Sequence, residues 1–311
     1  IDSTLGPILG ERATTAGKGT FNIAVAYNVA DFQRVDGREE IEVTLRHCTE
    51  FACTGGNPDL PLFKDVIQVD VRMRLKSQTL TTFLVYGLRN NLDIGLLLPF
   101  VRNDLTIFSH ARVITAPGSV PGVHVFDPLT ESPGQFGTAH AMGIGDMILR
   151  AKYGLTRLPF DAAILADVTV PTGNKANFLG TGAFRARGVF IASATGERFS
   201  PHLNLGMEVN AENENLSSIE YRLGSEWAIS PRVTLVGDLL GTVRPFLGDE
   251  FEARAVETQS LVGRSEIDFA LGAKYKIRDN AVLLFNYLVP MNDAGIRPET
   301  SFTFGVQMAV K

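Results

Sequence analysis

Charged side chains recur at every second position in several segments of this sequence. Arg72, Arg74 and Lys76 follow this spacing, and so do Glu266 and Asp268. Successive side chains of a β-strand point to opposite faces, so each set would lie on one face of a strand. Such a face can line a water-filled path, or its charges can pair across a narrow interior. Because acids and bases are mixed, we expect no strong anion or cation selectivity. With about twelve strands, the interior lies between a packed eight-stranded barrel and an open porin, so we favour a narrow or plugged lumen over a wide pore.

The predicted lumen-lining set contains strand charges that cannot face lipid, where a charge at the bilayer midplane costs roughly 2–4 kcal/mol. Its members are Arg72, Arg74, Lys76, Asp93, Asp146, Arg150, Lys152, Asp167, Glu208, Glu220, Arg222, Glu226, Asp238, Glu266, Asp268 and Lys274. For the basic ladder at positions 72, 74 and 76, pairing with neighbours such as Asp93 is a better explanation than a ligand site.

Catalytic signatures are absent from the sequence. It contains no Gly-x-Ser-x-Gly, no phosphate loop ending in Gly-Lys-Ser/Thr and no His-Glu-x-x-His. The five histidines are scattered, and of these His202 alone lies clearly inside an expected strand. A barrel lipase would need a Ser–His pair near one rim, which spacing does not exclude. We expect no catalytic residues, no cofactor and no enzyme activity.

The two cysteines, Cys48 and Cys53, lie close together in a segment rich in Gly, Pro and Asn. A local disulfide is the favoured interpretation and would require an oxidising compartment. A zinc site that includes His47 is the alternative, but the sequence offers no second pair of ligands. We therefore expect a disulfide and no metal.

Composition narrows the class of protein. Of 311 residues, 45% are hydrophobic and 20% are charged, yet no apolar run reaches the roughly 18 residues of a membrane helix. The net charge is −5, and Lys and Arg form no basic face with interleaved aromatics. Nucleic acid is therefore excluded as an expected partner.

Alternation with period two is the dominant pattern. Ile267, Phe269 and Leu271 alternate with charged or small residues, which predicts a strand with one apolar face. Helical periodicity competes nowhere over a comparable length. The predicted strands are 20–32, 66–88, 92–106, 144–155, 161–171, 186–196, 200–210, 218–228, 232–244, 264–277, 281–290 and 299–310.

The expected connections alternate between short and long. Short turns such as 89–91 and 278–280 alternate along the chain with long segments such as 33–65 and 107–143. This is typical of an outer-membrane barrel with tight periplasmic turns and longer extracellular loops. The predicted fold is therefore an all-β, transmembrane, antiparallel up-and-down barrel of about twelve strands, with both termini on the periplasmic side.

Segment 66–88 is too long for one crossing, which needs roughly 9–11 residues. Its apolar positions also change parity, which a bulge near Ser77–Thr79 would reconcile. Alternatively, Ser77-Gln78 is a turn and 40–47 is another strand, which gives fourteen strands. Residues 1–17 lack alternation, so we divide the chain into a periplasmic tail or plug at 1–17 and a barrel at 18–311.

Four aromatic residues precede short turns: Tyr86, Tyr153, Trp227 and Tyr275. An amphipathic ring at the level of the lipid headgroups accounts for this placement, so we expect an aromatic girdle.

Three groups of short motifs then resemble a known family. Gly143-Ile144-Gly145-Asp146-Met147, continuing to Tyr153-Gly154-Leu155, is similar to its strand signature, and Val170-Pro171-Thr172-Gly173 with Gly180-Thr181-Gly182 to its loop signature. Tyr86-Gly87-Leu88, Leu92-Asp93-Ile94-Gly95-Leu96 and Leu98-Pro99-Phe100 complete the set. Over roughly residues 80–311 the chain resembles the "MetA-pathway of phenol degradation" family of outer-membrane proteins. The resemblance implies an outer-membrane barrel and uptake of hydrophobic or aromatic compounds.

Two functions are weighed for such a barrel. The first is a passive outer-membrane channel for small, hydrophobic or aromatic solutes, in contact with lipid and lipopolysaccharide. The alternative is a docking barrel whose lumen is blocked and whose loops or N-terminus hold a protein partner. A soluble β-sandwich is a third hypothesis, and it predicts a protein that stays in the aqueous fraction without detergent.

Overall fold

The computed structural model describes residues 10–35, 37–46, 66–114, 134–155, 160–245 and 265–310. Within these ranges the chain forms fourteen β-strands and two single-turn 3-10 helices, η2 (Lys175–Asn177) and η3 (Glu214–Leu216). The strands are β1 (Phe21–Val35), β2 (Glu40–Arg46), β3 (Val66–Arg89), β4 (Leu92–Ile114), β5 (Gln135–Ile144), β6 (Met147–Leu155), β7 (Asp161–Val170), β8 (Arg185–Ser193), β9 (Phe199–Asn210), β10 (Ser218–Ala228), β11 (Val233–Val243), β12 (Ser265–Arg278), β13 (Ala281–Pro290) and β14 (Ile296–Val310).

Twelve of these strands close into one antiparallel barrel. The ring closes because β1 pairs with β14 on one side and with β3 on the other, from Phe21↔Val310 and Phe21↔Tyr86 onward. β4 then continues the ring by pairing with β3 and with β6, and from β6 to β14 each strand pairs with the next along the chain. The predicted twelve-stranded up-and-down barrel is confirmed.

The two faces of the wall differ in the way the alternation predicts. Apolar side chains such as Leu149, Leu223 and Phe304 are exposed on the outer face, and polar side chains such as Asp167 and Asp238 are buried on the inner face. An apolar outer belt suits hydrocarbon, and barrel closure pairs the backbone groups that lipid cannot satisfy. Among the described residues there is no helix long and apolar enough to cross a membrane.

Connection length separates the two ends of the barrel. The short-connection end carries the turn at Asn90–Asn91 and the turn at Asp279–Asn280. β1 begins and β14 ends there, since Phe21 pairs with Val310. The other end carries the longer connections, for example 171–184 between β7 and β8. The even number of ring strands and the separation of short from long connections therefore agree with what the sequence predicts.

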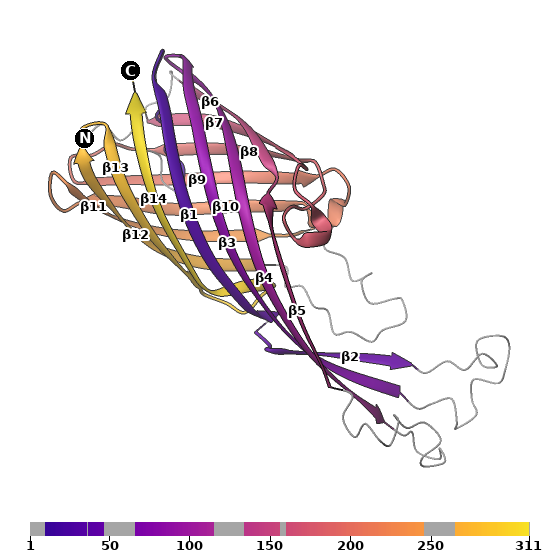
Figure 1. Ribbon diagram of the computed structural model, residues 1–311. Helices are drawn as coiled ribbons and strands as arrows, with labels where there is room; N and C mark the ends of the chain where they lie inside the picture. Colours follow the sequence, from indigo (N-terminus) through magenta and orange to yellow (C-terminus); the bar gives the residue numbers. More distant parts are fainter. Residues whose placement is uncertain are drawn as a thin grey trace.

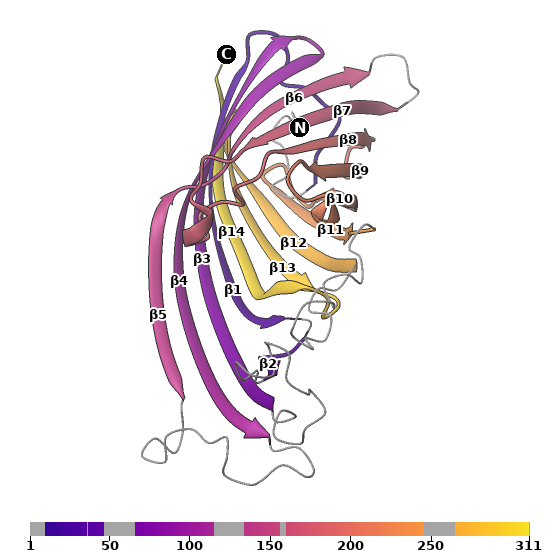
Figure 2. The same ribbon diagram turned by 90° about the vertical axis from the view of Figure 1, so that its right-hand side faces the viewer.

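A four-stranded extension leaves the barrel at the long-connection end (Figures 1 and 2). β3 and β4 are single strands of 24 and 23 residues, and beyond the barrel they are flanked by β2 and β5. Part of what was expected as long loops at 33–65 and 107–143 is therefore sheet.

The expectations for segment 66–88 need correction. The pairing of β3 with β4 runs without a register shift from Val66↔Ile114 to Gly87↔Asp93, so there is neither a bulge nor a turn near Ser77. The change of parity is therefore a change in residue type along one continuous outer face, which is charged at Arg72 and Arg74 and apolar at Leu80 and Tyr86. Residues 40–46 do form a strand, but it lies outside the barrel ring.

Candidate functional site

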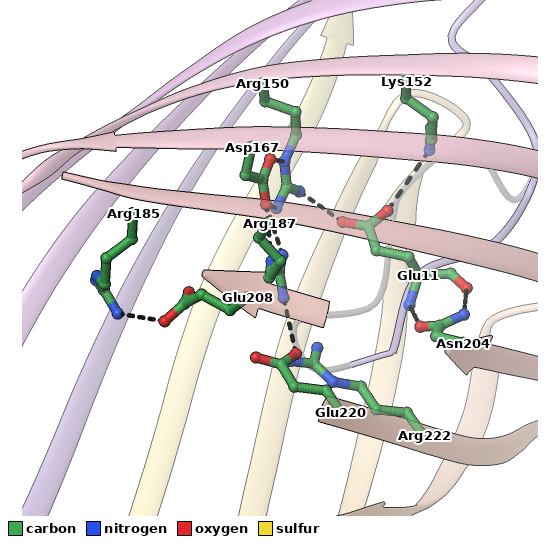
Figure 3. Close-up of polar contacts among 10 residues, drawn as sticks. All are labelled: Glu11, Arg150, Lys152, Asp167, Arg185, Arg187, Asn204, Glu208, Glu220 and Arg222. Atoms are coloured by element: carbon green, nitrogen blue, oxygen red, sulfur yellow. Dashed lines mark hydrogen bonds and ion pairs between the residues drawn. The ribbon is translucent and has the colours of Figure 1, made fainter. Parts of the chain in front are cut away.

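Charged side chains of five consecutive strands converge on the inner face, and we call them the charged wall (Figure 3). Asp167 of β7 lies at the centre. It accepts hydrogen bonds from Arg150 of β6 at 2.8 and 2.9 Å, and one of 2.6 Å from Arg187 of β8. The paired register of β6, β7 and β8 brings these residues side by side, Arg150 opposite Asp167 and Asp167 opposite Arg187.

The chain of ion pairs continues around the wall. Arg187 also donates to Glu220 of β10 at 3.2 Å, and Arg222 donates to the same carboxylate oxygen at 3.2 Å. Arg185 pairs with Glu208 of β9 at 3.0 Å. The structure thus brings together six of the predicted lumen-lining residues: Arg150, Lys152, Asp167, Glu208, Glu220 and Arg222.

Sequence reasoning missed Arg185 and Arg187. The signal was present, because Arg185, Arg187 and Val189 alternate with Ala186, Gly188 and Phe190. Arg187 connects two carboxylates, those of Asp167 and Glu220. Arg185 forms a separate pair with Glu208 next to them.

The N-terminal residues 10–17, which we call the N-terminal segment, lie against the charged wall inside the barrel. The backbone of Glu11 is held by Asn204, which accepts from the Glu11 N–H at 2.7 Å and donates to its carbonyl at 2.8 Å. The Glu11 carboxylate lies 2.6 Å from Arg150 Nη1 and 3.5 Å from Lys152 Nζ. No pattern in the sequence predicted these contacts.

Further along, the segment is fixed by apolar packing and backbone donors. Ala13 is buried in a cluster with Leu165, Ile191 and their neighbours, and its N–H donates to Ser193 Oγ at 3.1 Å. The Ala16 N–H donates to Asp93 Oδ2 at 2.9 Å. Asp93, a predicted lumen-lining residue, therefore contacts the segment rather than the basic ladder.

The segment reverses into β1 at the short-connection end. Gly17 and Gly19 have φ angles of +82° and +80°, which favour glycine. The reversal is fastened to β3, because Gly19 N donates to Gly87 O at 2.8 Å and Gly87 N donates to Thr20 O at 2.9 Å. A side chain on Gly87 would collide with the backbone of Gly17.

The charged wall strongly favours the ionised form of Glu11. Burial by itself would raise the pKa of this carboxyl, but Lys152, Arg150 and other bases of the wall lower the pKa from 4.5 to about 2. The attraction of the cations therefore outweighs desolvation, and Glu11 is a carboxylate at neutral pH.

On the opposite side of the lumen, the residues of β1, β3, β13 and β14 that line the cavity are uncharged, and we call this side the uncharged wall. Its inward side chains include Asn22, Ala26, Asn286, Thr303 and Gln307, all buried. The buried Arg297 of β14 lies further along, near the long-connection end. Between the two walls lies a cavity of about 410 Å³. Its lining combines bases and acids of the charged wall with the apolar side chains of Phe83, Val85, Leu97, Ile148 and Leu284.

The remaining predicted residues on the inner face form separate pairs. Glu226 binds Lys274 at 2.8 Å and lies 3.8 Å from Arg12 of the N-terminal segment. Asp238 contacts His202 Nε2 at 2.8 Å, with both side chains almost fully buried. Near the long-connection end, the pairs are Glu266 with Arg244 and Asp268 with Arg297.

The basic ladder of β3 is a wrong assignment. Arg72, Arg74 and Lys76 share parity with Leu80 and Tyr86, which are exposed on the outer face, and β3 has no bulge that would change this. Arg74 pairs with Asp31 of the neighbouring ring strand β1 at 2.6 Å on the outer face. These three residues therefore do not line the lumen.

Asp146 lies at the kink between β5 and β6, where it anchors a loop. Its carboxylate accepts hydrogen bonds from Gly173 N at 3.0 Å and from both the N–H and the hydroxyl of Thr181 at 2.7 Å. A side chain on Gly180 would meet this carboxylate, so the close approach requires glycine. The strand and loop motifs noted in the sequence therefore meet in space.

The four aromatic residues expected in a girdle, Tyr86, Tyr153, Trp227 and Tyr275, are all exposed on the outer face. Trp227 stacks on Phe199 with ring centroids 6.1 Å apart. Their role at the lipid headgroups stays a prediction. The expected disulfide between Cys48 and Cys53 lies outside the described residues.

Comparison with known proteins places the chain among outer-membrane barrels. Residues 66–298 match the family described as "Putative MetA-pathway of phenol degradation". No curated protein matches the chain in sequence.

Among solved structures, the chain is similar to the COG4313 outer membrane channel from Pseudomonas putida F1. The identity is 12%, the TM-score is 0.56, and the match covers 98% of this chain and 100% of that one. It is also similar to the Ralstonia pickettii toluene transporter TbuX, with 11% identity, a TM-score of 0.41 and coverage of 94% and 89%. The first similarity shows a shared fold, and both proteins are outer-membrane or transport proteins by title.

Proposed function

The chain belongs to the MetA-pathway of phenol degradation family, and from that premise we propose that it is a passive channel for small hydrophobic or aromatic solutes. The protein is a β-barrel of the bacterial outer membrane. The observation that carries the proposal is the cavity of about 410 Å³ inside a closed barrel, with charged side chains of both signs on one side and uncharged, largely apolar side chains on the other. The structure that shares the fold is titled an outer membrane channel.

We assign the N-terminal segment the role of a plug that narrows the path. It docks along the charged wall, where Glu11 and Arg12 pair with inward charges and Ala13 packs in an apolar cluster. The cavity remains beside it, next to the uncharged wall. A solute would therefore pass between the segment and β1, β3 and β13.

The other assignments follow from the placement of the residues. All the predicted lumen-lining residues except Arg72, Arg74 and Lys76, which face outward, line the path or stabilise its wall. Tyr86, Tyr153, Trp227 and Tyr275 act as a girdle at the periplasmic headgroups, with the short-connection end in the periplasm. Lipid and lipopolysaccharide surround the outer face.

The test is conductance in planar bilayers, with and without residues 1–17. We expect discrete steps from the full chain and clearly larger steps after the deletion, because the plug no longer narrows the lumen. Circular dichroism of both proteins controls for folding. Flux of benzyl alcohol into liposomes, measured alongside, reports an uncharged aromatic solute directly. A folded deletion variant that gives neither conductance nor flux would reject the channel.

That negative result would favour the docking barrel instead. The extension supports this alternative, because β5 pairs only with β4 and leaves its other edge without a strand partner in the described part of the chain. Exposed strand edges are templates for pairing with another chain. A complex that survives purification would support it, and a monomer with solute flux would contradict it.

A further inference from the structure

Glu11 brings a carboxylate to a wall that is rich in bases. Five basic side chains, those of Arg150, Lys152, Arg185, Arg187 and Arg222, face three carboxylates in the network of Figure 3, those of Asp167, Glu208 and Glu220. Asp167 and Glu220 each accept from two arginines. Glu11 is the further carboxylate, and it comes from outside the barrel wall.

The contacts of Glu11 are those that a bound acid would make. One carboxylate oxygen lies 2.6 Å from Arg150 Nη1 and the other 3.5 Å from Lys152 Nζ. Charge-assisted bonds of this kind are about twice as strong as neutral ones. The chain therefore carries an acid–base recognition site that one of its own side chains occupies.

The space next to this site is amphipathic. The same cavity that Glu11, Arg150 and Lys152 line extends to Phe83, Val85 and Leu284 on the other side. Its volume of about 410 Å³ falls within the roughly 300–1,000 Å³ that small-molecule sites occupy. A molecule with an apolar body and one carboxylate matches both halves of the lining.

We propose that Arg150 and Lys152 form a binding site for the carboxylate of an amphipathic organic acid, and that Glu11 is the internal occupant which this solute displaces. The inference rests on the proposed function, because it names a solute class and a release step for that same lumen. The apolar body of the solute then lies against Phe83, Val85 and Leu284.

The structure also supplies a clean way to remove the internal acid. Asn204 holds the backbone of Glu11 by two hydrogen bonds, independently of its side chain. Glu11→Gln therefore deletes the charge while the segment keeps its backbone anchor. Glu197→Gln is the matched control, because Glu197 is an exposed acid in the turn between β8 and β9.

Calorimetry on the full-length protein in detergent compares benzoate, benzamide and acetate. We expect Glu11→Gln to raise benzoate affinity by about tenfold, the scale of one charge-assisted contact, and to leave benzamide binding unchanged. Glu197→Gln should behave as wild type. Adding Lys152→Met to Glu11→Gln should weaken benzoate again. Equal binding of acetate and benzoate would overturn the amphipathic assignment, and no gain in Glu11→Gln would overturn displacement.

Hydrogen exchange reads the release step separately. Benzoate should speed exchange of the Ala13 and Ala16 amides, which Ser193 and Asp93 protect in the docked segment, and benzamide should not. Unchanged exchange at saturating benzoate would refute displacement. Benzyl alcohol flux without any benzoate effect would support the channel and reject displacement of Glu11. Benzoate binding with displacement but without conductance or flux would support the binding site and reject the channel.

Discussion

The charged and uncharged walls of the lumen lie across one cavity, yet they solve the problem of a polar interior differently. On the charged wall, Asp167 and its neighbours satisfy one another through ion pairs at 2.6 to 3.2 Å. On the uncharged wall, small and amide side chains such as Ala26 and Asn286 leave room instead. The N-terminal segment docks only where ion pairs and an apolar cluster hold it. The comparison teaches that the paired charges build a seat for the plug, and that the path follows the other wall.

The largest expected effect is a loss of stability when the carboxylate at the centre of the charged wall is removed. Asp167→Ala leaves Arg150 and Arg187 buried without their shared partner, and losing one member of a buried pair costs roughly 3–5 kcal/mol. Urea unfolding of the protein in detergent, followed by tryptophan fluorescence, measures the loss. Asn286→Ala on the uncharged wall is the control and should cost about 1 kcal/mol or less. Equal losses at the two positions would contradict the distinction between the walls.

The second prediction concerns pH and Glu11. Because docking lowers the pKa of Glu11 from 4.5 to about 2, its contribution is complete above pH 4.5 and is lost as the pH falls towards 2. The shift corresponds to about 3 kcal/mol at most. Conductance should therefore be constant from pH 8 to 5 and rise below pH 4.5. The charged groups that face Glu11 are Lys152, Arg150, Arg187, Arg222 and Asp93.

Glu11→Gln is the control for this pH dependence. It should lack the component assigned to Glu11 while keeping any change caused by other carboxylates. A rise of conductance that is identical in the two proteins would assign the effect elsewhere.

A smaller effect is expected from the backbone anchor of the segment. Ser193→Ala removes the acceptor of the Ala13 N–H, and an unsatisfied buried donor costs about 1–3 kcal/mol. Exchange of the Ala13 amide should accelerate accordingly. Thr303→Val on the uncharged wall should leave this amide unchanged. Acceleration by both variants would mean that the segment is not docked on one wall alone.

The smallest expected effect adds a charge to the uncharged wall. Ala24 lines the cavity, so Ala24→Lys places a cation beside the path. The free energy that distinguishes anion from cation passage should change in favour of anions by about 1 kcal/mol or less in solvated surroundings. The reversal potential measured in a salt gradient reports this change. Ala24→Gln, similar in size but neutral, should leave the reversal potential unchanged. If the lysine leaves selectivity unchanged, ions do not pass along this wall.

The alternation of apolar and polar residues predicted the barrel well, but it did not predict where the N-terminal segment docks on the charged wall. Alternation identifies each ring strand because every inward or outward position carries its own signal, as in Ile267 and Asp268. The docking of Glu11 on Arg150 joins residues 139 positions apart, and a segment without regular structure leaves no periodic signal. The error at Arg72 arose because charged strand positions were assumed to face inward, whereas β3 carries charged residues and apolar residues such as Leu80 on the same outer face without a bulge.

The reversal at Gly17 and Gly19 has a consequence for how the plug competes with solutes. Its fastening to Gly87 ties the segment to the rim, so an undocked segment stays tethered at an effective concentration on the order of millimolar. Re-docking is then an intramolecular reaction, and a solute must outcompete a ligand that dilution cannot remove. The threshold for opening is thus set by tether length and by the affinity of Glu11 for its seat, and it is the same whatever the number of channels in the membrane.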